Sequence, residues 1–437
     1  MIAALGMRDF LPHITPVITQ TDAEQITQSL DLRTPPPVFY ANPYPVYAAL
    51  RKQDPVRRMP DGSILISRYA DLIDVYKDAK TFSSDKKVEF SAKFATLPRL
   101  FEHHTTSLVF NDPPVHTQVR QIMMGALTRR AIDHVETSLT LLVNRLADAI
   151  EAQGGGDLIE DFAAAIPIEI IGNLLGIPHA DRGPLRRWSL AILGALEPML
   201  TPEQESAGNA AVKEFLDYLK VLIEGRRAHP GDPQHDVLTR LIQGEGAKNN
   251  ELLSESELLH NCIFILNAGH ETTTNLIGNA LVALEEWPEQ KAHLIQLLAD
   301  TTNDSEKRND VMNAAVDEFL RFEPPNQLGS RRATVDCVVG GVPLPAGTLL
   351  TLCIGAANRD PLQFERPEEL DVTRTNCKHL SFGFGVHQCA GLHLARLEGR
   401  VALEIFLQRF PNYQLTAAPV RGGRARFRGF LSGPFKT

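Results

Sequence analysis

The stretch LSFGFGVHQCAG, Leu380–Gly391, places three glycines, two phenylalanines, a histidine and a cysteine within twelve residues. Gly383, Gly385 and Gly391 allow tight or left-handed backbone conformations, which can bring several peptide N–H groups close to one atom. We expect that atom to be the sulfur of Cys389. An amphipathic helix follows at once, and the positive end of its dipole favours a thiolate over a thiol. The stretch therefore predicts a stabilised thiolate at the start of a helix.

A thiolate in this position is compatible with three kinds of chemistry. It could act as a nucleophile, with His387 as a nearby base. It could bind zinc, although the spacing of His387 and His393 from Cys389 matches no common zinc site. It could also ligate a haem iron. A purely structural buried cysteine is the least satisfactory interpretation, because the surrounding glycines have no purpose in a core.

The composition of the chain bounds its class. Of its 437 residues 43% are hydrophobic and 22% are charged, as in a soluble globular protein with a large core. The net charge of −9 argues against nucleic acid or an anionic membrane surface as a partner. Five cysteines without CxxC spacing favour a reducing cytoplasm. The short apolar start is interrupted by Arg8 and Asp9, so neither a signal peptide nor a membrane anchor is expected.

The order of patterns predicts a mainly α fold with small β-sheets. Residues 1–35 read as an irregular, proline-rich lead-in, and residues 36–437 as a single domain. Apolar spacing of three and four residues predicts helices through most of 115–320. Residues 334–352 are rich in β-branched residues and glycine, which is typical of short hairpins. Residues 356–391 read as loop, followed by the helix after Cys389.

The longest helical pattern lies between two clear end signals. Ser254 and Glu257 have the spacing of a capping box, and Pro288 should end the helix after Trp287. At 1.5 Å per residue this helix is roughly 48 Å long, enough to cross a domain. Polar residues interrupt its apolar centre, and Gly269 there would allow a close approach by another group.

The cysteine loop carries a family resemblance. FGFGVHQCAG, Phe382–Gly391, matches all six fixed positions of Phe-Gly-x-Gly-x-His-x-Cys-x-Gly and resembles the haem-binding loop of cytochrome P450. The resemblance implies that Cys389 is the axial iron ligand, that Phe382 shields its sulfur and that His387 lies near a haem propionate. Gly383 and Gly391 would shape the loop. It also implies the cytochrome P450 fold, with haem between the long central helix and the cysteine loop and helix.

The sequence AGHET, Ala268–Thr272, is similar to the family pattern Ala-Gly-x-[Asp/Glu]-Thr on the central helix. The resemblance implies that Ala268 and Gly269 lie against the haem, and that Glu271 and Thr272 manage protons at bound oxygen. The Thr272 hydroxyl can also bond back to the carbonyl of Ala268. His270 is about 200° around the helix from Ala268, so we interpret it as structural.

Glu318 and Arg321 are three residues apart in DEFLR. Taken alone, they could be an ordinary surface ion pair on one helical face. Beside the cysteine loop they resemble the Glu-x-x-Arg pair of cytochromes P450, which packs on the cysteine side of the haem. The resemblance implies a structural role, in which the pair joins Arg374 or its neighbours and holds the loop in place.

His116 and Arg120 are four residues apart on one predicted helical face. From the residues alone, a solvated basic helix and an anion-binding face are equally acceptable interpretations. The segment is similar to the His-Thr-x-x-Arg segment of cytochromes P450, which implies contact with a haem propionate. Arg331, rather than its neighbour Arg332, takes the position of a third propionate-binding arginine.

The implied activity is that of a haem-thiolate monooxygenase. With haem b (iron protoporphyrin IX), such an enzyme activates O₂ to hydroxylate, O-dealkylate or epoxidise a small, largely apolar organic substrate. Electrons would come from NAD(P)H through ferredoxin reductase and ferredoxin, in the cytoplasm. Positive charge for ferredoxin docking over the cysteine loop could come from Arg120, Arg129, Arg130 and Arg396. Two alternatives remain: a haem-binding sensor or carrier, and a peroxide-driven or nitric-oxide-reducing member of the same fold.

The substrate contacts are the least specific part of the prediction. The segment 89–110 is expected to lie over the pocket, and its Lys93 and Arg99 could meet a substrate carboxylate. Apolar and aromatic residues dominate the candidate lining, which is typical of sites for apolar molecules. The candidate residues are Phe90, Phe94, Leu266, Asn267, Asn326, Leu328 and Phe430.

Overall fold

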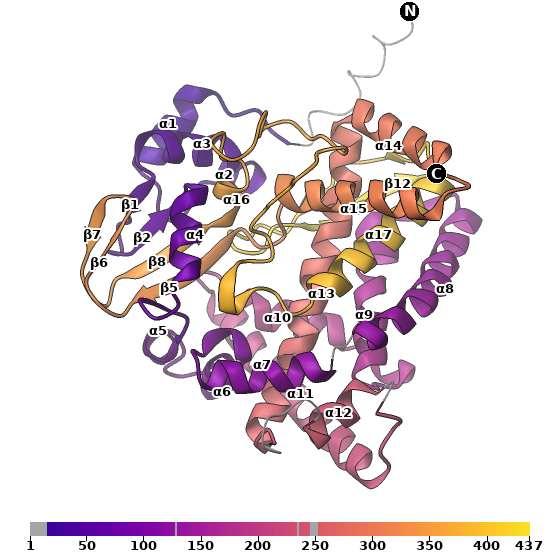
Figure 1. The fold of residues 1–437 in the computed structure, drawn as a ribbon, viewed down its shortest axis with the longest axis horizontal. Helices are drawn as coiled ribbons and strands as arrows, with labels where there is room; N and C mark the ends of the chain where they lie inside the picture. Colours follow the sequence, from indigo (N-terminus) through magenta and orange to yellow (C-terminus); the bar gives the residue numbers. More distant parts are fainter. Residues whose placement is uncertain (1–14, 127–128, 234–235, 245–251) are drawn as a thin grey trace, which may run out of the picture.

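The computed structural model describes residues 15–126, 129–233, 236–244 and 252–437, without the side chains of Ala126 and 129–134. A helical body occupies one side of the molecule and a small sheet region the other (Figure 1). The body contains α5 (Lys87–Lys93), α6 (Pro98–Thr106), α7 (Val115–Ala126), α8 (Arg129–Gln153), α9 (Ala165–Leu174), α10 (Leu185–Gly194), α11 (Pro202–Ala228), α12 (Val237–Gln243), α13 (Glu255–Glu286), α14 (Pro288–Asp300), α15 (Ser305–Phe322) and α17 (Leu392–Arg409).

The main sheet has the strand order β1-β2-β8-β5-β3. Its strands are β1 (Val56–Arg58), β2 (Ile64–Ile66), β8 (Leu349–Cys353), β5 (Leu328–Ala333) and β3 (Phe82–Ser83). β2 and β8 pair in parallel, with Ile64 opposite Leu350. The helices beside this sheet are α1 (Gln20–Gln28), α2 (Pro37–Ala41), α3 (Tyr44–Gln53), α4 (Tyr69–Lys77) and α16 (Ile354–Ala357).

Three smaller sheets complete the strand content of the described residues. One is the predicted hairpin of β6 (Cys337–Val339) and β7 (Val342–Leu344). The others are β4 (Gly155–Asp157) with β12 (Pro434–Lys436) and β9 (Gln414–Leu415), and β10 (Val420–Arg421) with β11 (Phe430–Ser432). The mainly α architecture with small sheets is thus confirmed.

The expectation of an irregular lead-in is wrong for α1. Thr19 caps this helix by accepting a hydrogen bond from the N–H of Asp22. Ala23 and Thr27 are buried, and α1 packs against α3. The segment has few apolar residues, so its periodicity is weak, and packing against α3 stabilises it instead. Residues 1–14 of the lead-in lie outside the described part of the chain.

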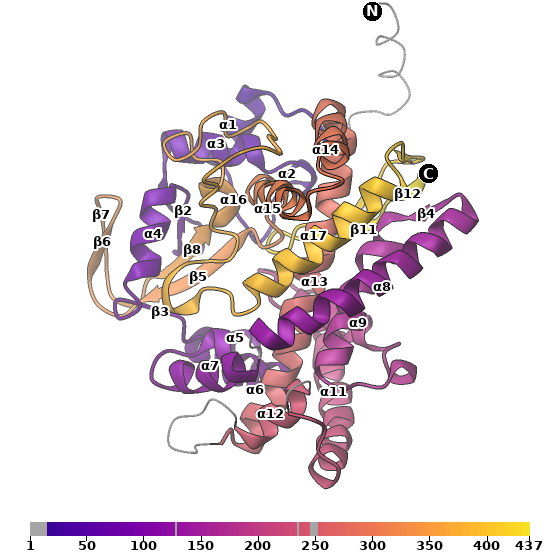
Figure 2. The same ribbon diagram turned by 45° about the vertical axis from the view of Figure 1, so that its right-hand side comes forward.

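The central helix α13 has the predicted ends. Ser254 and Glu257 form the capping box, and Trp287 is the C-cap before Pro288. The helix runs through the middle of the helical body, with α15 and α17 beside it (Figure 2). It is 32 residues long, and 23 of its residues are buried. Among the described residues, no helix combines the length and apolarity that crossing a membrane requires.

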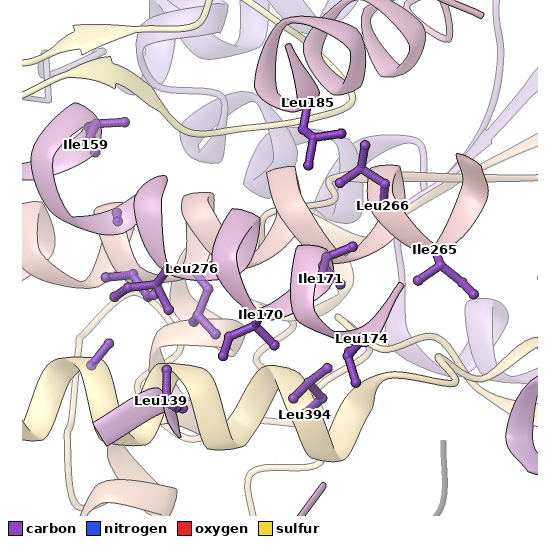
Figure 3. Packing of buried hydrophobic residues seen from close by; sticks show 14 of the residues in the cluster. Leu139, Ile159, Ile170, Ile171, Leu174, Leu185, Ile265, Leu266, Leu276 and Leu394 are labelled. Atoms are coloured by element: carbon purple, nitrogen blue, oxygen red, sulfur yellow. The ribbon is translucent and has the colours of Figure 1, made fainter. Parts of the chain in front are cut away.

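Close packing around α13 explains two of its glycines. Leu266 of α13 meets Leu185 of α10, and Ile171 of α9 lies directly against α13 (Figure 3). A Cβ on Gly269 would lie 2.5 Å from the Cδ1 of Ile171, and one on Gly278 would lie 2.5 Å from the Cδ1 of Ile159. A core side chain, Ile171, is therefore one group that approaches Gly269 closely.

Candidate functional site

The backbone of the cysteine loop requires glycine at two positions. Gly383 and Gly385 have φ values of 65° and 72°. A Cβ on Gly385 would also lie 2.6 Å from the carbonyl oxygen of Tyr76. Gly391 has an ordinary φ of −90° and is the N-cap of α17, so the expected left-handed freedom is not used there. Because α17 begins at Leu392, the helix starts three residues later than the sequence suggested.

Cys389 lies at the centre of this loop with its backbone N–H donating to the carbonyl of Phe382 at 2.8 Å. Burial raises the pKa of its thiol, while the N–H of Gly391 and the charges of Arg120 and Arg396 lower it by less. The side chain nevertheless keeps accessible surface. The loop alone therefore does not produce the thiolate that was expected; a bound metal ion would deprotonate the thiol outright.

Phe382 is partly buried beside Cys389. The ring of His379 lies 5.5 Å from its centroid, and the guanidinium of Arg396 lies 4.8 Å from it. Arg396 is fixed in turn by a 2.7 Å hydrogen bond from its Nε to Asp317. These contacts fix the position of the Phe382 ring within the cysteine loop; its shielding of the sulfur stays a prediction.

The structure brings together the four residues that were expected to bind propionates. The rings of His116 and His387 are 4.0 Å apart. Burial, followed by the charges of Arg331, His116 and Arg120, lowers the pKa of His387. Burial and Arg120 lower the pKa of His116 to about 4. These effects place α7, β5 and the cysteine loop within electrostatic range of one another.

This cluster fits the propionate groups of a haem. Both ring nitrogens of His116 and the Nε2 of His387 are buried without a hydrogen-bond partner. Asp112 is the nearby acid, and its carboxylate already accepts hydrogen bonds from Ser83 and Ser84. Buried cationic and imidazole groups that depress one another's pKa are stabilised by an anion between them. Two propionates would supply that charge.

Glu318 and Arg321 form a buried network, not a surface pair. Both side chains are 0% exposed, and the guanidinium donates to both carboxylate oxygens at 2.7 and 2.8 Å. The remaining N–H groups of Arg321 donate to the carbonyls of Asn358, Pro367 and Glu369. The expected contact with Arg374 is present, with its Nε 2.9 Å from Glu318. The network ties α15 to the segment that leads into the cysteine loop.

The centre of α13 presents different partners on its two sides. The hydroxyl of Thr272 donates to the carbonyl of Ala268 at 2.6 Å, as expected. Glu271 is only 4% exposed, and its Oε1 accepts from Arg424 at 2.5 Å. Burial raises the pKa of Glu271 to about 7, although Arg424 opposes this rise. Glu271 can therefore both hold and release a proton near neutral pH.

Arg424 contacts the candidate residue Glu271, and the sequence did not indicate it. It lies 153 residues from Glu271, in the C-terminal segment RGGRARFRG, 421–429. That segment carries four arginines in a chain of net charge −9, and this was the signal that could have indicated buried acidic partners. Arg421 and Arg428 of the same segment both bind Glu323.

The candidate substrate residues separate into three groups. Phe90 and Phe94 are buried together, with ring centroids 5.3 Å apart; Phe94 stacks on His104, and Phe90 lies tilted against the same ring. Asn267, Asn326 and Phe430 lie around α13 and the C-terminal segment; the Asn267 amide is buried without a partner, Asn326 bridges to Phe427, and Phe430 lines a cavity.

Leu266 and Leu328 form the third group, because both lie in packed clusters apart from the other candidates. Leu266 is 0% exposed within the helical core, against α10. Leu328 is 1% exposed and belongs to a separate cluster with Tyr44 and Tyr47. Strand β5 turns Leu328 towards the N-terminal helices, and the register of that strand could not be deduced from the residues alone.

The structure describes the side chains of two of the four arginines proposed for ferredoxin docking. Arg396 is 30% exposed in its pair with Asp317, and Arg120 lies within electrostatic range of Cys389 and His387. The side chains of Arg129 and Arg130 lie outside the described residues.

Comparison with known proteins agrees with this site. Residues 187–416 match the family model described as cytochrome P450. The chain is 35% identical over 369 residues to a vitamin D(3) 25-hydroxylase of Pseudonocardia autotrophica, covering 84% of this chain and 85% of that relative. The structure of P450BioI with hexadec-9Z-enoic acid ligated acyl carrier protein superposes with a TM-score of 0.82 at 30% identity, covering 91% and 99% of the two chains. CalO2 gives 0.83 at 29% identity, covering 93% and 98%. The chain therefore belongs to the cytochrome P450 family of haem monooxygenases.

Proposed function

We propose that this enzyme binds haem b through Cys389 and oxygenates a small, largely apolar organic molecule. The electrons come from NAD(P)H through a ferredoxin reductase and a ferredoxin. The observation that supports this most directly is the position of Arg120. It lies within electrostatic range of both the Cys389 thiol and the His387 ring, so the sulfur and the cluster of cationic groups border one site.

Each group around that site has a separate task. Cys389 is the iron ligand, and His116, Arg120, Arg331 and His387 bind the propionates. Bound haem supplies the activation of O₂, which the protein tunes through the thiolate and its hydrogen bonds. The buried Glu318–Arg321–Arg374 network keeps the loop in the ligating geometry, and Phe382 limits access of water to the sulfur.

The central helix supplies protons in this proposal. Glu271 has a pKa of about 7 and can exchange a proton near neutral pH. Thr272 is the next residue, and its hydroxyl is held by the carbonyl of Ala268 at 2.6 Å. We assign Glu271 the role of passing protons inward and Thr272 that of orienting the final donor.

An apolar substrate is supported by both the residues and the relatives. Phe90 and Phe94 form an aromatic cluster with Phe110 in the segment expected over the pocket. One relative is named a vitamin D(3) 25-hydroxylase, and P450BioI was solved with an acyl carrier protein bearing hexadec-9Z-enoic acid. Both named molecules are long and mainly hydrocarbon. The proposed oxygenation is a hydroxylation, an O-dealkylation or an epoxidation.

The ligand assignment is tested with Cys389→Ala. The purified wild-type protein should be red and should give the carbon-monoxide difference band of a thiolate-ligated haem, and the variant should lose that band. Cys337→Ala, the same change on strand β6, is the control and should keep it. A normal band in the Cys389 variant would remove this residue as the ligand.

The proton role is tested with Thr272→Ala. We expect haem binding to be unchanged and reducing equivalents to be diverted to hydrogen peroxide, measured as product formed per NAD(P)H consumed. Unchanged coupling would contradict the role. The same assay with a ferredoxin pair separates a monooxygenase from a haem-binding sensor, which would show no substrate-dependent oxidation of NAD(P)H, and from a peroxide-driven enzyme, which would need no electron donor.

A further inference from the structure

A small cavity borders the centre of α13. Its volume is about 20 Å³. α13 contributes His270, Glu271 and Thr274 to its walls, and α10 contributes Arg186. Arg424 of the C-terminal segment and Leu431 of β11 complete it. Leu431 is 43% exposed, whereas Glu271 is 4% exposed. The cavity thus lies between the surface of the protein and a buried carboxyl group.

Polar atoms without partners surround this cavity. Neither ring nitrogen of His270 has a hydrogen bond, and the same holds for the Oε2 of Glu271 and the Oγ1 of Thr274. All three side chains are at least nine-tenths buried, with exposed fractions of 1%, 4% and 5%. Buried polar atoms are normally paired, so four orphaned atoms on one cavity indicate a missing partner.

The size of the cavity identifies that partner. A cavity of about 10–15 Å³ or more holds one water molecule, provided that two to four polar groups bind it. A donor or acceptor is needed for each of His270, Glu271 and Thr274, and a water molecule can be both. A larger organic ligand does not fit into about 20 Å³. Water is therefore the occupant that the geometry favours.

We propose that this cavity holds an ordered water molecule bonded to His270, Thr274 and the Oε2 of Glu271, and that His270 is a positioning residue that controls the protonation of Glu271 through this water. The inference rests on the proposed role of Glu271. It goes beyond our interpretation of His270 as structural. The neutral imidazole offers one donor and one acceptor nitrogen, so it can orient the water towards the carboxylate.

His270 acts by orientation and is not itself the proton source. Burial, and then the charge of Arg186, lowers its pKa to about 3, so it stays neutral at neutral pH. When Glu271 accepts a proton from the water, that water takes a proton from solvent at the Leu431 end of the cavity. The other charged groups facing the carboxylate are Arg424, Arg186 and Glu197. The two arginines lower the pKa of Glu271, and Glu197 raises it.

The first test measures the protonation of Glu271 directly in the resting protein. Infrared difference spectra of the wild type against Glu271→Gln identify the carboxyl band of this residue, which is then titrated against pH. His270→Phe removes both ring nitrogens and should raise the midpoint by about one pH unit, the size of one hydrogen bond to a charged group. His270→Gln retains a donor and an acceptor and should restore the midpoint. An unchanged midpoint in His270→Phe would overturn the proposal.

A matched pair of threonine variants gives a second test, which does not depend on the folding of the His270 variant. Thr274→Val removes the hydroxyl group on the cavity, whereas Thr273→Val removes a buried hydroxyl group one residue away, off the cavity. Only Thr274→Val should raise the midpoint of Glu271. Equal effects of the two variants, or no effect of Thr274→Val, would contradict a shared water.

A second readout separates this inference from the proposed function. In the haem-loaded enzyme the pH profile of coupling should move with the infrared midpoint in His270→Phe. If the titration shifts while the wild type shows no oxygenation, the water site stands and the proposed function fails. If coupling depends on Thr272 but the infrared midpoint of Glu271 is unchanged in His270→Phe, the function stands and this inference fails.

Discussion

Two buried polar regions of this protein differ in how completely they are paired. On the cysteine side, Arg321 directs every guanidinium nitrogen to an acceptor, and Glu318 receives Arg321 and Arg374. At the centre of α13, His270, Glu271 and Thr274 are equally buried but leave four polar atoms without partners. A fully paired network fixes one geometry, whereas unpaired groups retain the capacity to bind and exchange. Burial alone therefore does not distinguish a structural polar group from a reactive one.

The largest effect should come from breaking the paired side. Arg321→Gln leaves the buried Glu318 with a single cation, and such losses cost about 3–5 kcal/mol. We expect that decrease in the free energy of unfolding, measured in urea, together with loss of haem incorporation. Arg366→Gln is the control, because Arg366 and Glu369 have the same three-residue spacing but are 58% and 52% exposed. That pair should contribute at most about 1 kcal/mol. Equal losses in the two variants would contradict the comparison.

One buried acid on the cysteine side is an exception to the full pairing around Arg321. Glu398 of α17 is 1% exposed, and burial raises its pKa to about 8 from an ordinary value of 4.5. The folded state holds this proton more tightly than the unfolded state, so stability falls as the pH rises from about 4.5 to 8.

Glu398→Gln should remove that pH dependence. At pH 8 we expect a gain on the order of 2–4 kcal/mol, since each pKa unit corresponds to about 1.4 kcal/mol and the amide still needs a partner. Below pH 4.5 the gain should vanish. Urea titrations at several pH values measure it, with Glu404→Gln as the control, since Glu404 lies on the same helix in an ion pair with Arg308. A gain independent of pH would refute this account.

The ion pair of Glu271 tests the unpaired side. Arg424→Gln removes the cation that opposes the effect of burial, so the pKa of Glu271 should rise from about 7 by about one pH unit. The infrared titration of the carboxyl band measures the shift. Arg421→Gln, in the same segment but paired with Glu323, should leave the midpoint unchanged. A shift of the same size in both variants would point to general loosening of the segment.

The smallest effect concerns the packing that positions both regions. Gly269→Ala places a Cβ against the Cδ1 of Ile171, a flexible side-chain end, and overpacking of this kind costs about 1 kcal/mol or more. Ile171→Val removes the clashing Cδ1, so the double variant should recover most of the loss. Urea unfolding of the four proteins in this cycle measures the coupling. Additive losses would show that Ile171 is not the obstacle.

Local features of this molecule could be predicted from the sequence, because short-range physics determines them. The capping box of Ser254, the left-handed glycines at 383 and 385, and the bond from Thr272 to Ala268 each depend on residues within four positions. The contact between Glu271 and Arg424 depends on the complete fold, as does the direction of Leu328. No local pattern specifies which of several arginines reaches a buried acid, or towards which cluster a short strand turns.

The parallel pairing of β2 with β8 has a consequence for synthesis of the chain. Ile64 cannot pair with Leu350 until 286 further residues have been synthesised (350 − 64). At about 5–20 residues per second, this takes roughly 15–60 s on the ribosome. During that interval the hairpin of β1 and β2 exposes an unpaired edge, which is a template for association with other chains. Slower growth and added chaperones during expression should therefore reduce association through this edge, at a stage before haem can bind.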